Sequence, residues 1–207
     1  REEELYMRAL ELFDRGQINL AEQRFSEFIE SFPTSIKLAA AFFLRAETRV
    51  KDENWIGAAN DYLESFKVNT LGAITSVKYL KDSLKKNNGS VILFSSIAVK
   101  NGFANHSVIA TAKGGIEALT VSLAAELAPN IKVNCIAPSL TVSSMTKSIT
   151  SNENIKKAIE LLHPIPKIGE AKDHSKLAAY LLGKSNTWIT GQIFNVDGGR
   201  SSLRIKG

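Results

Sequence analysis

The sequence predicts an α/β fold, a parallel sheet with flanking helices, preceded by an all-α segment of helical hairpins. The sheet is indicated by GSVILFSS at residues 89–96, a short apolar run opened by glycine and closed by two serines, as in a buried parallel strand. A long helical pattern follows it over residues 109–127. The all-α segment is indicated by residues 2–65, where apolar residues recur at helical spacing throughout.

The first elements in chain order are two antiparallel helices joined by a tight turn. Their helical spacing is broken at Arg15-Gly16 and stops before Pro33. A looser copy follows after a period of about 37 residues, which indicates helical repeats. The pattern of small and aromatic residues resembles the tetratricopeptide repeat at Ala9, Gly16, Ala21, Phe25 and Pro33. The alternative is an unrelated helical hairpin.

Such repeats imply a groove for a partner peptide or protein subunit. The candidate contacts are Phe42, Phe43 and Trp55. The alternative interpretation is that these aromatic side chains form the core between the helices.

The charge distribution suggests two segments of different origin. Residues 1–65 hold 8 Lys+Arg against 13 Asp+Glu, a net charge of −5, whereas residues 66–207 hold 18 against 8, a net charge of +10. No Pro-, Gly- or Ser-rich linker separates them. We therefore expect domains at about 1–64 and 65–207, and one hypothesis is a chimera without its own activity.

The strand at 89–96 and the helix after it predict a functional site. Ser96 lies at the carboxyl end of the strand, where ligands of open α/β sheets bind. Lys113 lies early in the following helix and should project near that end. Alone, the serines would be explained as hydroxyls that bond the local backbone, and Lys113 as a solvated lysine.

Ser96 and Lys113, at this spacing, resemble the motif of the short-chain dehydrogenase/reductase family. The resemblance continues at Asn69 in VNTLGA and in IKVNCIAPSLT and ITGQIFNVDGG, which resemble the family's last two core strands, and it covers about residues 66–203. It implies the C-terminal part of a Rossmann-type sheet, with about three strands and flanking helices.

The resemblance implies an oxidoreductase that uses NAD or NADP on the carbonyl or secondary alcohol group of a small molecule. It makes Asn69, Ser96 and Lys113 catalytic residues, and Lys113 also a ligand of the cofactor ribose. The family's proton-donating tyrosine corresponds to Ile109, which has no proton to give. We therefore expect impaired or absent activity.

His106 is a candidate substitute for that tyrosine. It lies three residues before Ile109, and an imidazole titrates near neutral pH. The alternative is a histidine at the helix start that bonds to the backbone or to solvent.

The cofactor contacts implied by the resemblance, besides Lys113, are Pro138, Ser139 and Thr141. Ser139 replaces the family's glycine, and Ser143 stands at its usual threonine position. The family's Gly-x-x-x-Gly-x-Gly turn, which receives the pyrophosphate, is absent from this sequence. We expect the nucleotide-binding half to be missing, so NAD and NADP cannot be distinguished.

The remaining features bound location and partners. The lone Cys135 excludes an internal disulfide and favours a reducing, cytoplasmic location. No apolar run approaches membrane-spanning length, and the lysines are too scattered to predict nucleic-acid binding. His106, His163 and His174 stand apart, so no metal site is expected. The strand at 91–94 should have an open edge, which predicts a homo-oligomer or marginal stability.

Overall fold

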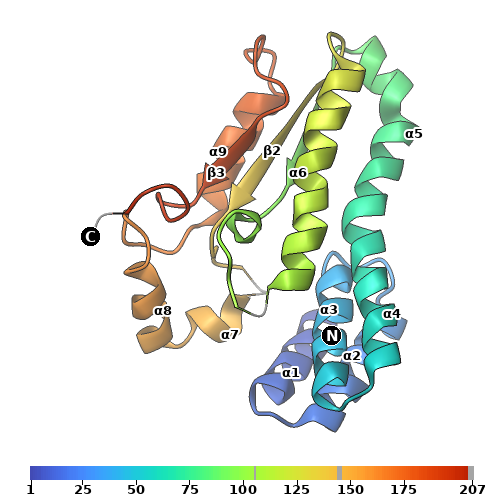
Figure 1. Cartoon of the computed structure of the whole chain (residues 1–207), viewed down its shortest axis with the longest axis vertical. Helices are drawn as coiled ribbons and strands as arrows, with labels where there is room; N and C mark the ends of the chain where they lie inside the picture. The colour runs from blue at the N-terminus through green and yellow to red at the C-terminus, as the bar shows by residue number, and fades with distance from the viewer. Residues whose placement is uncertain (105, 144–145, 205–207) are drawn as a thin grey trace. The chain divides into compact units, whose positions relative to one another are not determined.

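The structure is a computed structural model that describes residues 1–104, 106–143 and 146–204 (Figure 1). The chain divides into two compact units, Arg1–Leu71 and Gly72–Gly207. Each unit is described separately.

The first unit is all helical, as the spacing of its apolar residues predicts. Each helix packs against the next one in the chain. Its elements are α1 (Glu2–Asp14), α2 (Ile18–Ser31), α3 (Leu38–Lys51), α4 (Trp55–Phe66) and a π-helical turn (Lys67–Leu71). Gly16 adopts a φ of 70° between α1 and α2, a left-handed conformation that glycine reaches without strain. The likeness of these helices to a tetratricopeptide repeat stays a prediction.

Aromatic packing forms the core of the first unit. Tyr6 from α1 meets Phe28 and Phe25 from α2 edge-on, with ring centroids 5.2 and 6.3 Å apart. All three side chains are fully buried. Pairs of this geometry stabilise a core beyond the area that they bury.

A buried ion-pair network joins α3 and α4. Arg45 donates to both carboxylate oxygens of Asp61, at 2.9 and 2.7 Å, and Arg49 donates to the same carboxylate at 2.9 Å. Asp61 is only 2% exposed, so the two guanidinium groups compensate for the burial of this carboxylate.

The second unit has an α/β fold, in which helices flank a three-stranded parallel sheet, and this confirms the predicted fold class of this part (Figure 1). The strands lie in the order β1-β2-β3, and every pair is parallel. Its elements are α5 (Gly72–Lys86), β1 (Ser90–Phe94), a 3₁₀ turn (Ile97–Val99), α6 (Ser107–Leu127), β2 (Lys132–Pro138), α7 (Lys147–Thr150), α8 (Glu153–Glu160), α9 (Ala171–Leu182) and β3 (Ile193–Val196).

The core of this unit lies where α5 and α6 meet the sheet. Val77 from α5 and Ile116 and Leu123 from α6 pack with Val133 and Cys135 of β2. The central strand β2 is buried on both faces, and its buried polar residue Asn134 bonds the Ile189 carbonyl oxygen and the Gln192 amide.

Helix α6 corrects the expectation that no segment is long and apolar enough to cross a membrane. Its 21 residues meet that test by length and composition alone. The core helix of a soluble protein meets the same test, and α6 packs against β1 and β2.

Strand β1 lies at the edge of the sheet, as the sequence predicts. Among the described residues it pairs only with β2. Phe94, its last residue, is 46% exposed. Association through this edge stays a prediction.

Candidate active site

The carboxyl ends of β1 and β2 supply the polar groups of the candidate site. Because the strands are parallel, Ser95 and Ser96 after β1 lie at the same end of the sheet as Ser139 after β2. Ser96 begins the 3₁₀ turn, and its Oγ accepts a hydrogen bond from the Ala98 amide at 3.2 Å. Among the described residues, its hydroxyl hydrogen has no acceptor.

The neighbouring Ser95 has a structural role. Its hydroxyl is buried and lies 3.2 Å from the carbonyl oxygen of Lys113 and 2.9 Å from a carboxylate oxygen of Glu117. These contacts tie the end of β1 to α6. The alternative of hydroxyls that bond the local backbone fits Ser96, which accepts from the Ala98 amide, whereas Ser95 bonds groups 18 and 22 residues away.

Lys113 reaches from α6 to the last residue of β1. Its Nζ donates to the carbonyl oxygen of Phe94 at 3.1 Å. Desolvation lowers the pKa of this ammonium group, and the Cys135 thiol opposes that shift. Lys113 is not among the residues that line the cavity of about 1300 Å³ at this end of the sheet.

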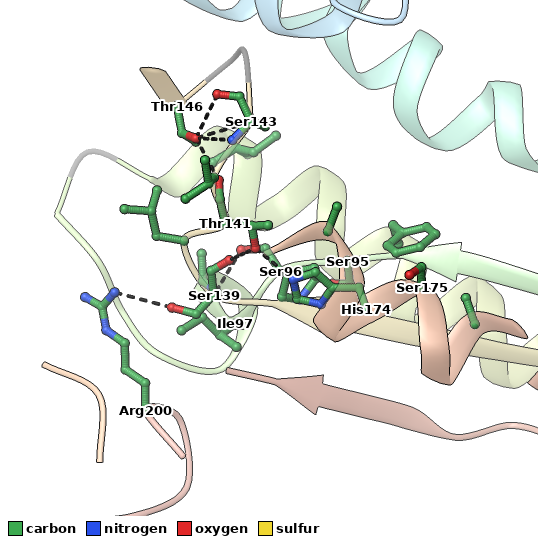
Figure 2. Close-up of a pocket in the computed structure, with 18 of the residues that line it drawn as sticks. Ser95, Ser96, Ile97, Ser139, Thr141, Ser143, Thr146, His174, Ser175 and Arg200 are labelled. Carbon is green, nitrogen blue, oxygen red and sulfur yellow. Dashed lines mark hydrogen bonds between the residues drawn. The ribbon is translucent and has the colours of Figure 1, made fainter. Parts of the chain in front are cut away.

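A cavity of about 1300 Å³ opens at this end of the sheet (Figure 2). It brings together most of the residues that the sequence selects. The predicted site residues that line it are Ser96, His106, Pro138, Ser139 and Thr141, and Ile109 and Ser143 line it as well. Their catalytic and cofactor-binding roles stay predictions.

His106 has features of both interpretations that the sequence left open, a histidine at the helix start and a residue of the candidate site. It is the residue before α6, and its Nδ1 lies 2.7 Å from the carbonyl oxygen of Ala104, as in the alternative of a helix-start histidine. It also lines the cavity beside Ile109. Its ring meets the edge of Phe103, with centroids 5.6 Å apart.

Two buried histidines, which the sequence analysis did not select, hold the segment after β2. His163 Nε2 lies 2.8 Å from Ser139 Oγ, and His174 Nε2 lies 2.8 Å from Thr141 Oγ1. His163 Nδ1 lies 2.8 Å from the Ile159 carbonyl oxygen, so Nδ1 carries the hydrogen and donates it to this oxygen. In the neutral ring, Nε2 then accepts a hydrogen bond from the Ser139 hydroxyl.

His163 and His174 stand apart in the sequence, as expected, but they lie close to the same segment after β2 in the structure. His163 and His174 both line a second cavity of about 280 Å³. Burial lowers the pKa of His174, and its Nδ1 has no partner among the described residues. The described residues contain no group of three or more His, Cys, Asp or Glu that could hold a metal ion.

Arg200 is a third residue that sequence reasoning missed. It follows β3 and lines the main cavity, where Figure 2 shows it directed at Ser139. A charged residue just after Asp-Gly-Gly, at a strand end, was the only signal in the sequence.

Asn69 belongs to the first unit, whereas the cavity belongs to the second. It lies in the π-helical turn, and its side-chain amide donates to the Ser65 carbonyl oxygen at 3.0 Å. Single π turns in helices are frequent at functional sites.

Comparisons with known proteins agree on one family. A family model described as enoyl-(acyl carrier protein) reductase matches residues 38–201, a longer stretch than the expected 66–203 because it begins within α3. A 3-oxoacyl-[acyl-carrier-protein] reductase of Chlamydia trachomatis is 33% identical over 152 residues, which cover 73% of this chain and 58% of that protein. A chloroplastic tropinone reductase homolog of Arabidopsis thaliana is 38% identical over 114 residues, covering 55% and 35%.

Solved structures show the same likeness. A short-chain type dehydrogenase/reductase from Mycobacterium ulcerans superimposes with a TM-score of 0.66 and 26% identity, covering 70% of this chain and 54% of that one. ElxO with NADP bound superimposes with a TM-score of 0.65 and 30% identity, covering 70% and 59%. The chain thus spans between 35% and 59% of the length of these relatives.

Proposed function

The chain belongs to the short-chain dehydrogenase/reductase family, and we propose that its cavity is the site of an NAD(P)-dependent oxidoreduction of a carbonyl or secondary alcohol group. The observation that carries this proposal is the placement of Ser96, Ile109 and Ser139 around one cavity at the carboxyl ends of β1 and β2. Ligands of open α/β sheets bind at this end.

The described residues fit one end of the cofactor. The cavity is large enough for a nicotinamide ring together with a substrate, and Pro138 to Thr141 form its wall at the end of β2. When bound, the cofactor supplies or accepts the hydride. No glycine-rich turn before a helix is present for the pyrophosphate in the 207 residues, so these residues fit the nicotinamide end only.

Ser96 is proposed to bind the reacting oxygen. Its Oγ accepts from the Ala98 amide, which orients the hydroxyl and leaves its hydrogen to donate to a substrate oxygen. Lys113 is proposed to hold the cofactor ribose. It must then exchange its bond with the Phe94 carbonyl oxygen for one with a ribose hydroxyl.

The proposed site lacks the family's proton donor. Ile109 has no proton to exchange, and general acid/base help is typically worth about 10² to 10⁴ in rate. His106 is the proposed substitute, because it lines the same cavity and its Nε2 is not engaged among the described residues. We expect turnover slower than that of a relative with tyrosine.

A second candidate function is supported by the surface of the first unit. Trp55 and Ile56 at the start of α4 are 63% and 80% exposed, so Trp55 does not belong to the core as the alternative supposed. An exposed aromatic and aliphatic pair suits contact with a protein partner. We propose that residues 1–64 bind such a partner through α4. Partner capture that survives deletion of residues 1–64 would refute this.

Titration with NADH and NADPH tests the main proposal. We expect a saturable rise in melting temperature, since a ligand that binds only the folded state stabilises it. Slow nucleotide oxidation with a panel of ketones should be lost in Ser96→Ala and Lys113→Ala. Loss in His106→Gln would support its proton-transfer role. No response up to millimolar nucleotide would contradict a cofactor site in this chain.

A further inference from the structure

We propose that Arg200 is the anion-binding residue of the main cavity, so that the substrate of the proposed oxidoreduction carries a carboxylate or a similar oxyanion. This inference rests on the proposed function for the identity of the ligand. The binding of the anion itself is testable without any reaction.

The position of Arg200 fits that role. It lines the cavity of about 1300 Å³ that also contains Ser96 and Ile109. Figure 2 shows its side chain extending from the chain after β3 toward the segment after β2. A ligand that reaches Ser96 therefore lies in the same cavity as the guanidinium group.

The contacts of Arg200 orient its guanidinium group without using most of its donors. The group lies over the ring of Phe103, 4.8 Å from the centroid. Its Nη1 donates to Ser139 Oγ at 3.5 Å, a long and weak hydrogen bond. A cation–π contact gives the guanidinium no hydrogen-bond acceptor with a lone pair, so its N–H groups remain to donate to a carboxylate in bidentate geometry.

Arg200 has no carboxylate partner among the described residues. The carboxylate of Asp197 acts on Arg200 electrostatically, but its two oxygens accept hydrogen bonds from the backbone amides of Gly199 at 2.9 Å and Ser201 at 2.8 Å. No Asp or Glu stands among the described residues that line the cavity. A partly buried cation without a partner is costly, which favours an anionic ligand.

The rest of the cavity suits a ligand with an apolar segment between its anionic group and its reacting carbonyl or alcohol group. Phe94, Ile97, Leu140 and Leu182 contribute apolar walls. The expected ligand is therefore a ketone or secondary alcohol with an aliphatic body and one anionic end. An anion of the cofactor, such as a nucleotide phosphate, has the same chemistry and must be distinguished from a substrate anion.

The test compares a charged ligand with its neutral counterpart. Levulinate, its longer keto-acid homologues and their methyl esters are titrated by calorimetry at fixed ionic strength, with and without NADPH. We expect at least one acid to bind about tenfold or more tightly than its ester. Arg200→Gln should abolish that preference, and Arg200→Lys should retain only part of it.

A matched variant controls for charge alone. Arg204→Gln removes the same charge from an exposed position outside the described lining, and it should keep the preference for the acid. Melting temperatures of all variants verify folding. Equal binding of acid and ester, no binding of any acid, or a preference that survives in Arg200→Gln would overturn the proposal.

Two further outcomes distinguish a substrate anion from a cofactor anion, and the anion site from the proposed oxidoreduction. If Arg200→Gln weakens NADPH binding and leaves acid binding unchanged, Arg200 binds the cofactor and the substrate inference is wrong. If acids bind through Arg200 but no ketone is reduced, the anion site stands and the proposed oxidoreduction fails.

Discussion

The Nζ of Lys113 on α6 donates to the carbonyl oxygen of Phe94 at the end of β1, at a distance of 3.1 Å. This bond connects α6 to the strand that leads to Ser96. It also holds the ammonium group in a desolvated place, which lowers its pKa.

Lys113→Met should leave stability at pH 7 unchanged or raise it. The substitution loses one hydrogen bond but removes a charge whose burial is unfavourable, since the lowered pKa means that the folded chain holds the proton less tightly than the unfolded one. Urea unfolding measures the effect. A loss greater than about 1 kcal/mol would show that the bond to Phe94 outweighs the desolvation.

Stability should fall as the pH drops below 6.5 because of His174. Desolvation lowers its pKa from 6.5, so the unfolded chain binds the proton more tightly and stability is lost through and below that value. Melting temperatures at pH 7.5 and 5.5 measure the slope. His174→Gln, which keeps a donor toward Thr141, should flatten it, whereas His106→Gln serves as the control at an exposed histidine. An unchanged slope in His174→Gln would assign the effect to other groups.

Asp61→Ala should destabilise the first unit by about 3 to 5 kcal/mol, because Arg45 and Arg49 lose a buried partner. Trp188→Phe leaves Trp55 as the only tryptophan, so fluorescence during urea unfolding reports on this unit. Glu11→Ala, which breaks an exposed pair with Arg15, should change stability by less than about 1 kcal/mol. Similar effects of the two substitutions would contradict the importance of burial.

The free edge of β1 should lead to association of the chain or to marginal stability. An apolar edge strand offers unpaired backbone groups to another chain, and lysine blocks such pairing. Light scattering over a range of concentrations should detect oligomers, and Phe94→Lys should shift them toward monomer. A monodisperse wild-type monomer that melts above about 65 °C would contradict this prediction.

Much of the fold follows from local sequence patterns. The apolar run gives β1 and the helical spacing gives α6, because each pattern needs only neighbouring residues to identify the buried face, whereas β2 and β3 were expected from the family resemblance. Ser96, Ile109 and Ser139 could be placed near one another because parallel strands end on the same side of the sheet.

The sequence by itself therefore determined the α/β class and the order of the motifs, and the absence of a proton donor at Ile109 stays a prediction from the family resemblance. Only the tertiary structure decided that His163 contacts Ser139, that His174 contacts Thr141 and that the Arg200 guanidinium lies over the Phe103 ring. These partners lie 24, 33 and 97 residues apart in the sequence. The physical reason is that such contacts depend on how α8, α9 and the chain after β3 pack over the strand ends, which no local periodicity encodes.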